Sequence, residues 1–228
     1  MALVGMNRPL RRVGLIVALI SCGAAALGAA RWSDIAFEIG YAYENGNLYG
    51  WTPGFAQDYR KAVQWLLRAA EANHPRAQYM LGIDRAHGWG FPKDVDRAVE
   101  WFTKSALNGY GPAEYHLGWM YHKGDDVPRD DDRAIRLLEQ AGGQGMAKAH
   151  MALGMFHERG EGVPAKMVQA LKWYTLAVHF SRSRQGLFDN AAHTKQAQAT
   201  HDALVARLDQ QSVEQGWMLA SQWLVHHP

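Results

Sequence analysis

The sequence predicts an all-α fold, an α/α superhelical solenoid of helix-turn-helix repeats that follows an N-terminal export or anchor helix. Three observations support this prediction. Similar side chains recur every 36 residues, the recurring positions have helical spacing, and the first 30 residues are basic and apolar without any acid. We expect a signal peptide or membrane anchor over residues 1–30, repeats over residues 35–180, and C-terminal capping helices over residues 181–228.

The N-terminal segment has the layout of an export signal. Arg8, Arg11 and Arg12 form a basic region, and an uncharged run that ends in small residues follows them. Because such arginines stay on the cytoplasmic side, we expect the chain to be exported and to face the periplasm. Three fates are open: retention as an inner-membrane anchor, cleavage after Ala30 to leave a periplasmic protein, or lipidation at Cys22 in a lipobox-like Leu-Ile-Ser-Cys run.

The repeat is defined by columns of like residues in register. Ala77, Ala113 and Ala149 are spaced by 36 residues, and a Leu-Gly pair begins four residues after each alanine. Further columns hold Gly88, Gly124 and Gly160; Asp58, Asp94 and Asp130; Ala62, Ala98, Ala134 and Ala170; and Trp65, Trp101, Leu137 and Trp173. This agreement predicts four repeats, over residues 35–75, 76–112, 113–148 and 149–180.

Each repeat is expected to form two helices joined by a glycine turn. Ala113, Leu117 and Tyr121 share one face of the first helix. Gly124 lies where a positive φ is needed, and Asp130 lies where its side chain can cap the second helix. The Trp column is expected to fill the volume between layers. Since one helix pair cannot cover its own apolar face, neighbouring repeats must stack.

The first repeat carries an insertion at its turn. Its Ile39-Gly40 pair precedes Leu81-Gly82 by 42 residues instead of 36, which places six extra residues between Gly46 and Gly54. Solenoids tolerate insertions at turns. The aromatic residues Tyr49 and Trp51 make this insertion a candidate partner-binding loop, with folding back onto the first repeat as the equal alternative.

These columns resemble the Sel1-like repeat, a relative of the tetratricopeptide repeat. The fourth repeat carries the resemblance most clearly, with Ala149, Leu153-Gly154, Gly160-x-Gly162-Val163, Ala170, Trp173 and Ala177. The likeness covers about residues 35–180. Lys166 in place of the capping Asp and Leu137 in place of Trp are departures that affect local packing only.

The resemblance implies that the first helix of each repeat lines a concave groove that holds a partner protein or peptide. Positions between the core columns would then face this groove. The candidate partner-binding residues are Tyr41, Tyr79, Ile83, Tyr115, Trp119, His122, Met151 and Met155, and Phe37, Glu44, Ala86 and Glu158 complete the same set of positions. Packing between repeats is the alternative role for Tyr79 and Tyr115.

Beyond the fourth repeat the period stops. We expect a loop over residues 179–190, a helix over about 191–208, and a last helix that starts at Ser212 with a Ser-x-x-Gln capping box. This pair would close the end of the stack, as solenoids require. The alternative is that Trp217 and Trp223 form a docking helix.

Composition and motif spacing argue against several classes of function. Without residues 1–30 the balance is 21 basic against 22 acidic residues, or −1, which offers no footprint for nucleic acid. Cys22 is the only cysteine, so the fold must be independent of disulfides. The spacing of the histidines, as in His116 and His122, does not suit two metal ligands on one helix face, and Asp125 to Asp132 lacks the spacing of a calcium loop.

No phosphate loop, nucleophile elbow or acid-base pair is recognisable, so we expect no enzyme activity, cofactor or metal. The leading hypothesis is a non-catalytic, monomeric interaction scaffold or adaptor in the bacterial cell envelope, with membrane contact through its N-terminal segment and an unidentified protein or peptide as partner. The alternative hypothesis is an envelope protein that binds cell-wall glycan or polysaccharide.

Overall fold

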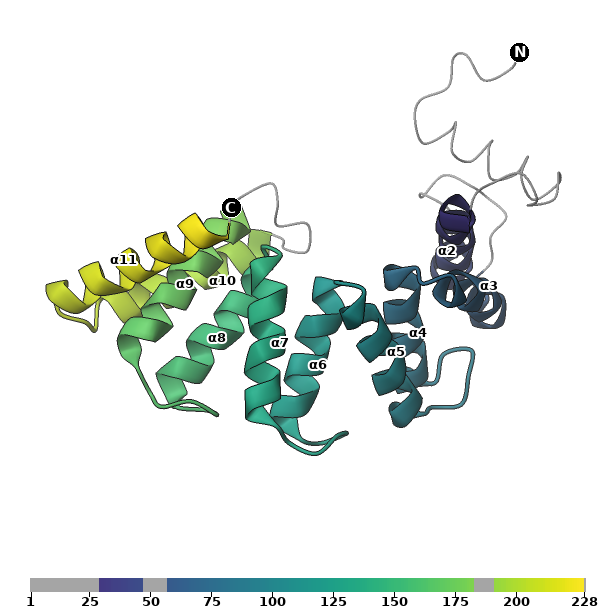
Figure 1. Ribbon diagram of the computed structural model, residues 1–228, viewed down its shortest axis with the longest axis horizontal. Helices are drawn as coiled ribbons and strands as arrows, with labels where there is room; N and C mark the ends of the chain where they lie inside the picture. The colour runs from purple at the N-terminus through teal and green to yellow at the C-terminus, as the bar shows by residue number, and fades with distance from the viewer. Residues whose placement is uncertain (1–28, 47–56, 183–190, 228) are drawn as a thin grey trace, which may run out of the picture. The chain divides into compact units, whose positions relative to one another are not determined.

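A computed structural model of the chain describes residues 29–46, 57–182 and 191–227. Over these residues the chain forms ten α-helices and no strand, which confirms the all-α prediction for this part (Figure 1). The helices belong to two compact units, one ending at Gly109 and the other beginning at Tyr110. Residues 1–28 of the predicted export segment and the insertion residues Tyr49 and Trp51 lie outside the described residues. Among the helices that are described, none is both long and apolar enough to cross a membrane.

Unit 1 consists of two consecutive helix pairs. Each helix packs against the next one along the chain, as expected for a stack of hairpins. Phe37, Leu66 and Leu81 are buried together in its core. Its helices are α2 (Ala29–Asn45), α3 (Tyr59–Glu71), α4 (Pro75–His87) and α5 (Val95–Leu107).

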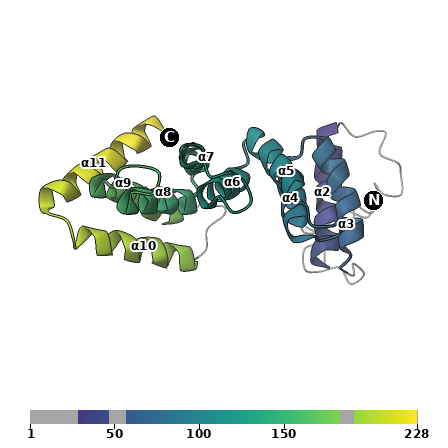
Figure 2. The ribbon, with the colours of Figure 1, turned by 90° about the horizontal axis from the view of Figure 1, so that it is seen from below.

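Unit 2 continues the same pattern and then departs from it. Successive helices again pack in order up to α9, which contacts both α10 and α11. In Figure 2, α8 and α9 lie between α10 on one side and α11 on the other. The helices of unit 2 are α6 (Gly111–Lys123), α7 (Asp131–Gly143), α8 (Ala147–Arg159), α9 (Met167–Arg182), α10 (Ala191–Val205) and α11 (Gln210–His226).

Short-range capping sets most helix boundaries within the repeats. The carboxylate of Asp130 accepts the backbone N–H of Arg133 at 2.9 Å, and Asp58 and Asp94 cap their helices in the same way. Gly124 ends α6 with φ 71°, in the left-handed region that glycine enters without steric cost. The predicted aspartate caps and turn glycines are therefore confirmed.

The predicted Trp column is fully buried only at Trp173, which is 4% exposed. Trp65 and Trp101 are only partly buried, and Arg68 and Lys104 lie over their rings. The next column along the chain is completely buried instead, and consists of Leu66, Phe102, Leu138 and Tyr174. Each of its members packs against the glycine of a Leu-Gly or Ile-Gly pair. At Gly82 a Cβ would lie 2.5 Å from a ring carbon of Phe102, so the missing side chain makes room for the ring.

Two boundaries near the C-terminus also differ from prediction. Helix α9 continues to Arg182, because Phe180 is buried against His150 and Trp223, so a loop starting at residue 179 is wrong. Helix α11 begins at Gln210 rather than at Ser212. Asp209 accepts the backbone N–H of Ser212 at 2.9 Å, and this carboxylate is the earlier and stronger cap.

Candidate protein-binding surface

A hollow in unit 2 gathers four of the predicted groove residues. Tyr115 and Trp119 lie on α6, and Met151 and Met155 lie one 36-residue period later on α8. Both helices have 13 residues and start at equivalent positions, so equivalent side chains point in the same direction. All four side chains line one hollow with a volume of about 370 Å³, which we call the α6–α8–α10 hollow.

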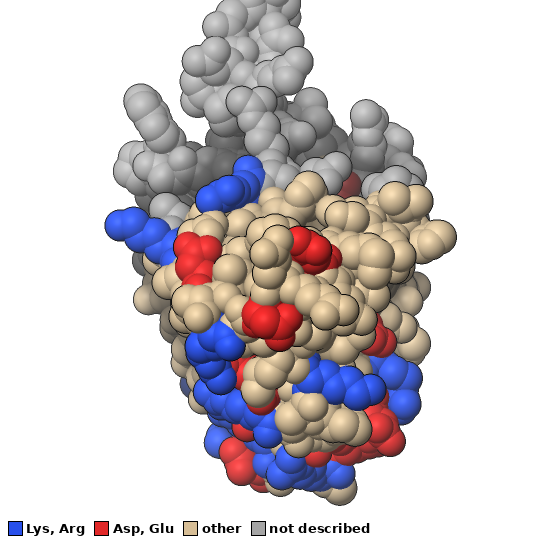
Figure 3. Space-filling model, turned by 90° about the vertical axis from the view of Figure 1, so that its left-hand side faces the viewer, with Lys and Arg blue, Asp and Glu red and all other residues tan. Residues whose placement is uncertain are grey.

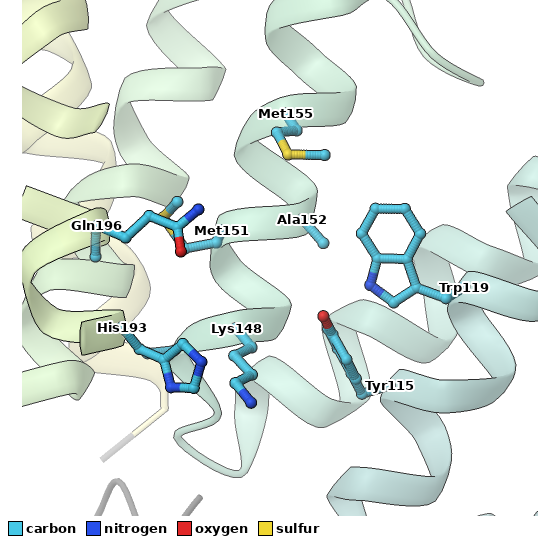
Figure 4. Close-up of a pocket in the computed structure, with 10 residues that line it drawn as sticks. Tyr115, Trp119, Lys148, Met151, Ala152, Met155, His193 and Gln196 are labelled. Atoms are coloured by element: carbon cyan, nitrogen blue, oxygen red, sulfur yellow. The ribbon is translucent and has the colours of Figure 1, made fainter. Parts of the chain in front are cut away.

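The third wall of this hollow comes from α10. His193, Gln196 and Ala197 face α8 across the hollow, and Figure 4 shows His193 and Gln196 opposite Tyr115 and Trp119. The repeat pattern did not predict these residues, because they lie outside the repeat. No periodic signal marks α10, and its position depends on packing against α9. The predicted capping helix therefore also helps to form the candidate binding surface.

The aromatic side of the hollow is held by edge-to-face contacts. The ring centroids of Tyr115 and Trp119 lie 6.4 Å apart at 74°, and those of Trp119 and Phe156 lie 5.9 Å apart at 83°. Phe156 is completely buried, so it anchors Trp119 from behind. The indole N–H of Trp119 is buried without a hydrogen-bond partner. Trp119 thus belongs to both the packing of α6 on α8 and the wall of the hollow.

A second hollow shares Tyr115 and Trp119 with the first. Its volume is about 470 Å³, and it differs from the first in charge. It is lined by Tyr115, His116, Trp119, Met120, Lys123, Asp125 and Asp126. Its lining contains two aspartates and one lysine, so the acidic residues outnumber the basic one. The lining of the α6–α8–α10 hollow contains Lys148 and no carboxylate.

His122 lines neither hollow, although its ring lies edge to face with that of Trp119 at 5.7 Å between centroids. Its ring centroid is 4.2 Å from that of Phe156, its Nδ1 is 2.9 Å from a carboxylate oxygen of Asp131, and its Nε2 is 3.6 Å from Glu161. Because His122 occupies the last turn of α6, it reaches Asp131 at the first turn of α7. Its contacts are those of a residue that ties successive repeats together.

The remaining predicted residues belong to unit 1. Tyr41 is 39% exposed and stacks on Phe37 with the ring centroids 5.9 Å apart. Tyr79 packs against Phe102 at 5.6 Å, and Ile83 is half-buried. Phe37 and Glu44, which the repeat pattern assigned to the groove, are instead buried, at 2% and 8% exposed. In unit 1 the pattern of groove positions is therefore only partly reproduced at the surface.

Two features of the described part of the chain concern metal and nucleic-acid binding. Within it, no group of three or more His, Cys, Asp or Glu side chains is placed to hold a metal ion. Figure 3 shows one side of the molecule, on which Lys and Arg side chains alternate with Asp and Glu and form no continuous basic patch.

Comparisons with known proteins identify the repeats and the fold. The profile of the Sel1 repeat matches residues 34–74, 75–110, 111–146 and 147–178. A Sel1 repeat protein from Oxalobacter formigenes has a similar structure, with a TM-score of 0.66, 23% identity, and coverage of 93% of this chain and 96% of that one. The protective antigen c5321 of uropathogenic Escherichia coli gives a TM-score of 0.60 at 28% identity, over 78% of this chain. This chain spans 41% of the length of that antigen. No curated protein matches the sequence.

Proposed function

The chain belongs to the Sel1 repeat family, whose members generally mediate protein–protein interaction, and from this premise we propose that it is a non-catalytic scaffold. In this proposal a segment of a partner protein binds in the α6–α8–α10 hollow. The partner is an extended or helical segment, because a space of about 370 Å³ accommodates a few side chains and not a folded domain.

The observation that carries this proposal is the convergence of the variable repeat positions on one surface. Tyr115, Trp119, Met151 and Met155 come from two repeats and line a single hollow. Rigid aromatic rings provide contact area at low ordering cost, and the flexible thioether of Met adapts to different shapes. This combination is typical of surfaces that bind protein segments.

The proposal includes a location in the cell envelope. Arg8, Arg11 and Arg12 followed by an uncharged run support export, with retention in the inner membrane as the preferred fate. Cleavage after Ala30 and lipidation at Cys22 are the alternatives. Cell fractionation with detergent partitioning tests this part: recovery of the intact chain in the cytoplasmic fraction would disprove export.

A capture experiment tests the binding role. The double variant Trp119→Ala with Met155→Ala is expected to lose the partner captured from solubilised membranes, because it removes one side chain from each of two walls. The matched control is Trp217→Ala with Met218→Ala, which removes the same residue types from α11, where they are 45% and 52% exposed. Loss of capture in the control alone would assign binding to the docking helix instead.

Two further measurements separate binding from folding and from glycan recognition. Gln196→Trp narrows the hollow from an exposed position on α10 without removing any core contact, and it should also abolish capture. The melting temperature and helicity of Gln196→Trp should stay close to those of the unmodified chain. On a glycan microarray we expect no signal that depends on Trp119; such a signal would favour the polysaccharide-binding alternative.

A further inference from the structure

The charge of the α6–α8–α10 hollow identifies the chemistry of the segment that it binds. Each of the three helices around the hollow contains a single acidic residue: Glu114 on α6, Glu158 on α8 and Asp202 on α10. None of the three lines the hollow. The lining includes the cation of Lys148 and no anion to balance it.

All three carboxylates are engaged elsewhere. Glu114 accepts a hydrogen bond from the Gln144 amide at 2.8 Å. Glu158 accepts from the Tyr174 hydroxyl at 2.9 Å and pairs with Arg207 at 2.6 Å, and Asp202 lies 2.9 Å from His201. The side chain of Lys148 has no ion pair or hydrogen bond within the described residues, so none of these residues neutralises its charge.

The polar and apolar groups of the hollow are separated in space. Figure 4 shows Lys148 between Tyr115 and His193 at one end. The other end is bounded by Met155, Ala152 and the Trp119 ring. A segment that fills this space needs an apolar side chain at one end and a hydrogen-bond acceptor with negative charge at the other.

We propose that the α6–α8–α10 hollow binds a partner-protein segment in which an apolar side chain lies next to an aspartate or glutamate. The apolar side chain inserts among Met151, Met155 and Trp119, and the carboxylate pairs with Lys148. This inference rests on the proposed function, since it defines the occupant of the same hollow. A basic segment would bring a second cation against Lys148 and would be rejected.

A random peptide library displayed on phage, selected on the full chain, tests this inference directly. We expect enriched peptides in which Asp or Glu lies within a few positions of a large apolar residue. Enrichment of neutral or basic peptides would overturn the proposal. Failure to enrich any peptide above an insert-free library would overturn the proposed function as well.

A charge-reversal variant provides the second measurement. Lys148→Glu should weaken the selected peptides about tenfold or more, should flatten the salt dependence of their binding, and should shift a repeated selection towards Lys and Arg. Lys195→Glu is the matched control, because Lys195 is an exposed lysine on α10, which borders the hollow, but is not among the lining residues. Equal effects of the two variants would contradict a specific role of Lys148.

The two levels of the proposal fail in different ways. If selected peptides keep their affinity for Trp119→Ala with Met155→Ala, they bind outside the hollow and the proposed function fails. If they lose affinity for that variant but keep it for Lys148→Glu, the hollow is the binding site and only its acidic preference is wrong.

Discussion

One pair of equivalent repeat positions holds two aromatic rings in unit 2 and two carboxyl groups in unit 1. In unit 2, His122 packs on Phe156, which lies one repeat further along the chain. In unit 1 the corresponding residues are Glu44 and Asp84. Asp84 precedes Phe156 by two 36-residue periods, and the six-residue insertion accounts for the larger spacing of Glu44. The repeat therefore places an aromatic contact in one unit and two carboxyl groups in the other.

The two positions differ in how their polar atoms are satisfied. His122 Nδ1 has Asp131 as a partner at 2.9 Å. In the described part of the chain, both carboxyl oxygens of Asp84 and Oε2 of Glu44 are buried without a hydrogen-bond partner. Burial raises the pKa of Glu44 to about 7, and burial together with the nearby Glu44 charge raises the pKa of Asp84 to about 8. A solenoid repeat thus tolerates a buried acid, but at a cost to stability that depends on pH.

The largest expected effect comes from moving the acid into unit 2. Phe156 is completely buried, so Phe156→Asp removes a ring from the core and buries a carboxylate there. We expect the free energy of unfolding in urea to fall by about 4 kcal/mol or more. Phe156→Leu, the control, should cost less than about 1.5 kcal/mol. A loss below about 1 kcal/mol for the aspartate variant would mean that this position is open to water.

The pH dependence of unit 1 should be the next largest effect. Because both folded-state pKa values are raised above the ordinary values of 4.5 and 3.8, the native state holds protons that the unfolded state releases. The stability that these two carboxyl groups allow is therefore complete below about pH 4 and is lost as pH rises through about 8, by several kcal/mol. Hydrogen exchange, corrected for intrinsic rates, should show faster opening of α2 and α4 at pH 9 than at pH 6, with α6 and α8 as the internal reference.

Replacing Asp84 should remove most of the pH dependence of stability in unit 1. Asp84→Met introduces the residue found one period later, at Met120. We expect stabilisation of unit 1 by about 2 kcal/mol at pH 8 and little change at pH 5, because only the ionised form is costly. Equal stabilisation at both pH values would indicate that packing, and not charge, limits this position.

The smallest effect is expected at His122. In His122→Phe the contact with Phe156 is kept and the hydrogen bond to Asp131 is lost. Asp131 still accepts hydrogen bonds from Arg129, at 3.0 Å from Nε and 2.9 Å from Nη2, so the cost should stay near 1 kcal/mol. Thermal unfolding measures this change, and a loss above about 3 kcal/mol would show that the histidine carries more of the repeat contact than Arg129 can replace.

Features that depend on neighbouring residues along the chain were predictable from the sequence. The period itself, the capping role of Asp94 and Asp130, and the turn role of Gly124 follow from interactions over a few residues. A side-chain cap or a positive φ needs only local geometry, and the 36-residue spacing repeats that geometry in each copy.

The choice between adjacent apolar columns was not predictable in the same way. Trp101 and Phe102 are neighbours about 100° apart on one helix, and both are large and apolar. Only the glycine on the facing helix decides that Phe102 is buried and Trp101 is left partly exposed. Trp65 and Trp101 are for this reason less buried than predicted, whereas Trp173 of the same column is buried.

By itself, therefore, the sequence determined the repeat family, the helical class and the ends of most repeat helices. Tertiary structure alone decided that α10 completes the binding hollow, that Glu44 is buried near Asp84, and that the described lining of the hollow places no acid beside Lys148. These features join residues from separate helices. Their positions follow from how the helices pack, and no local pattern along the chain encodes them.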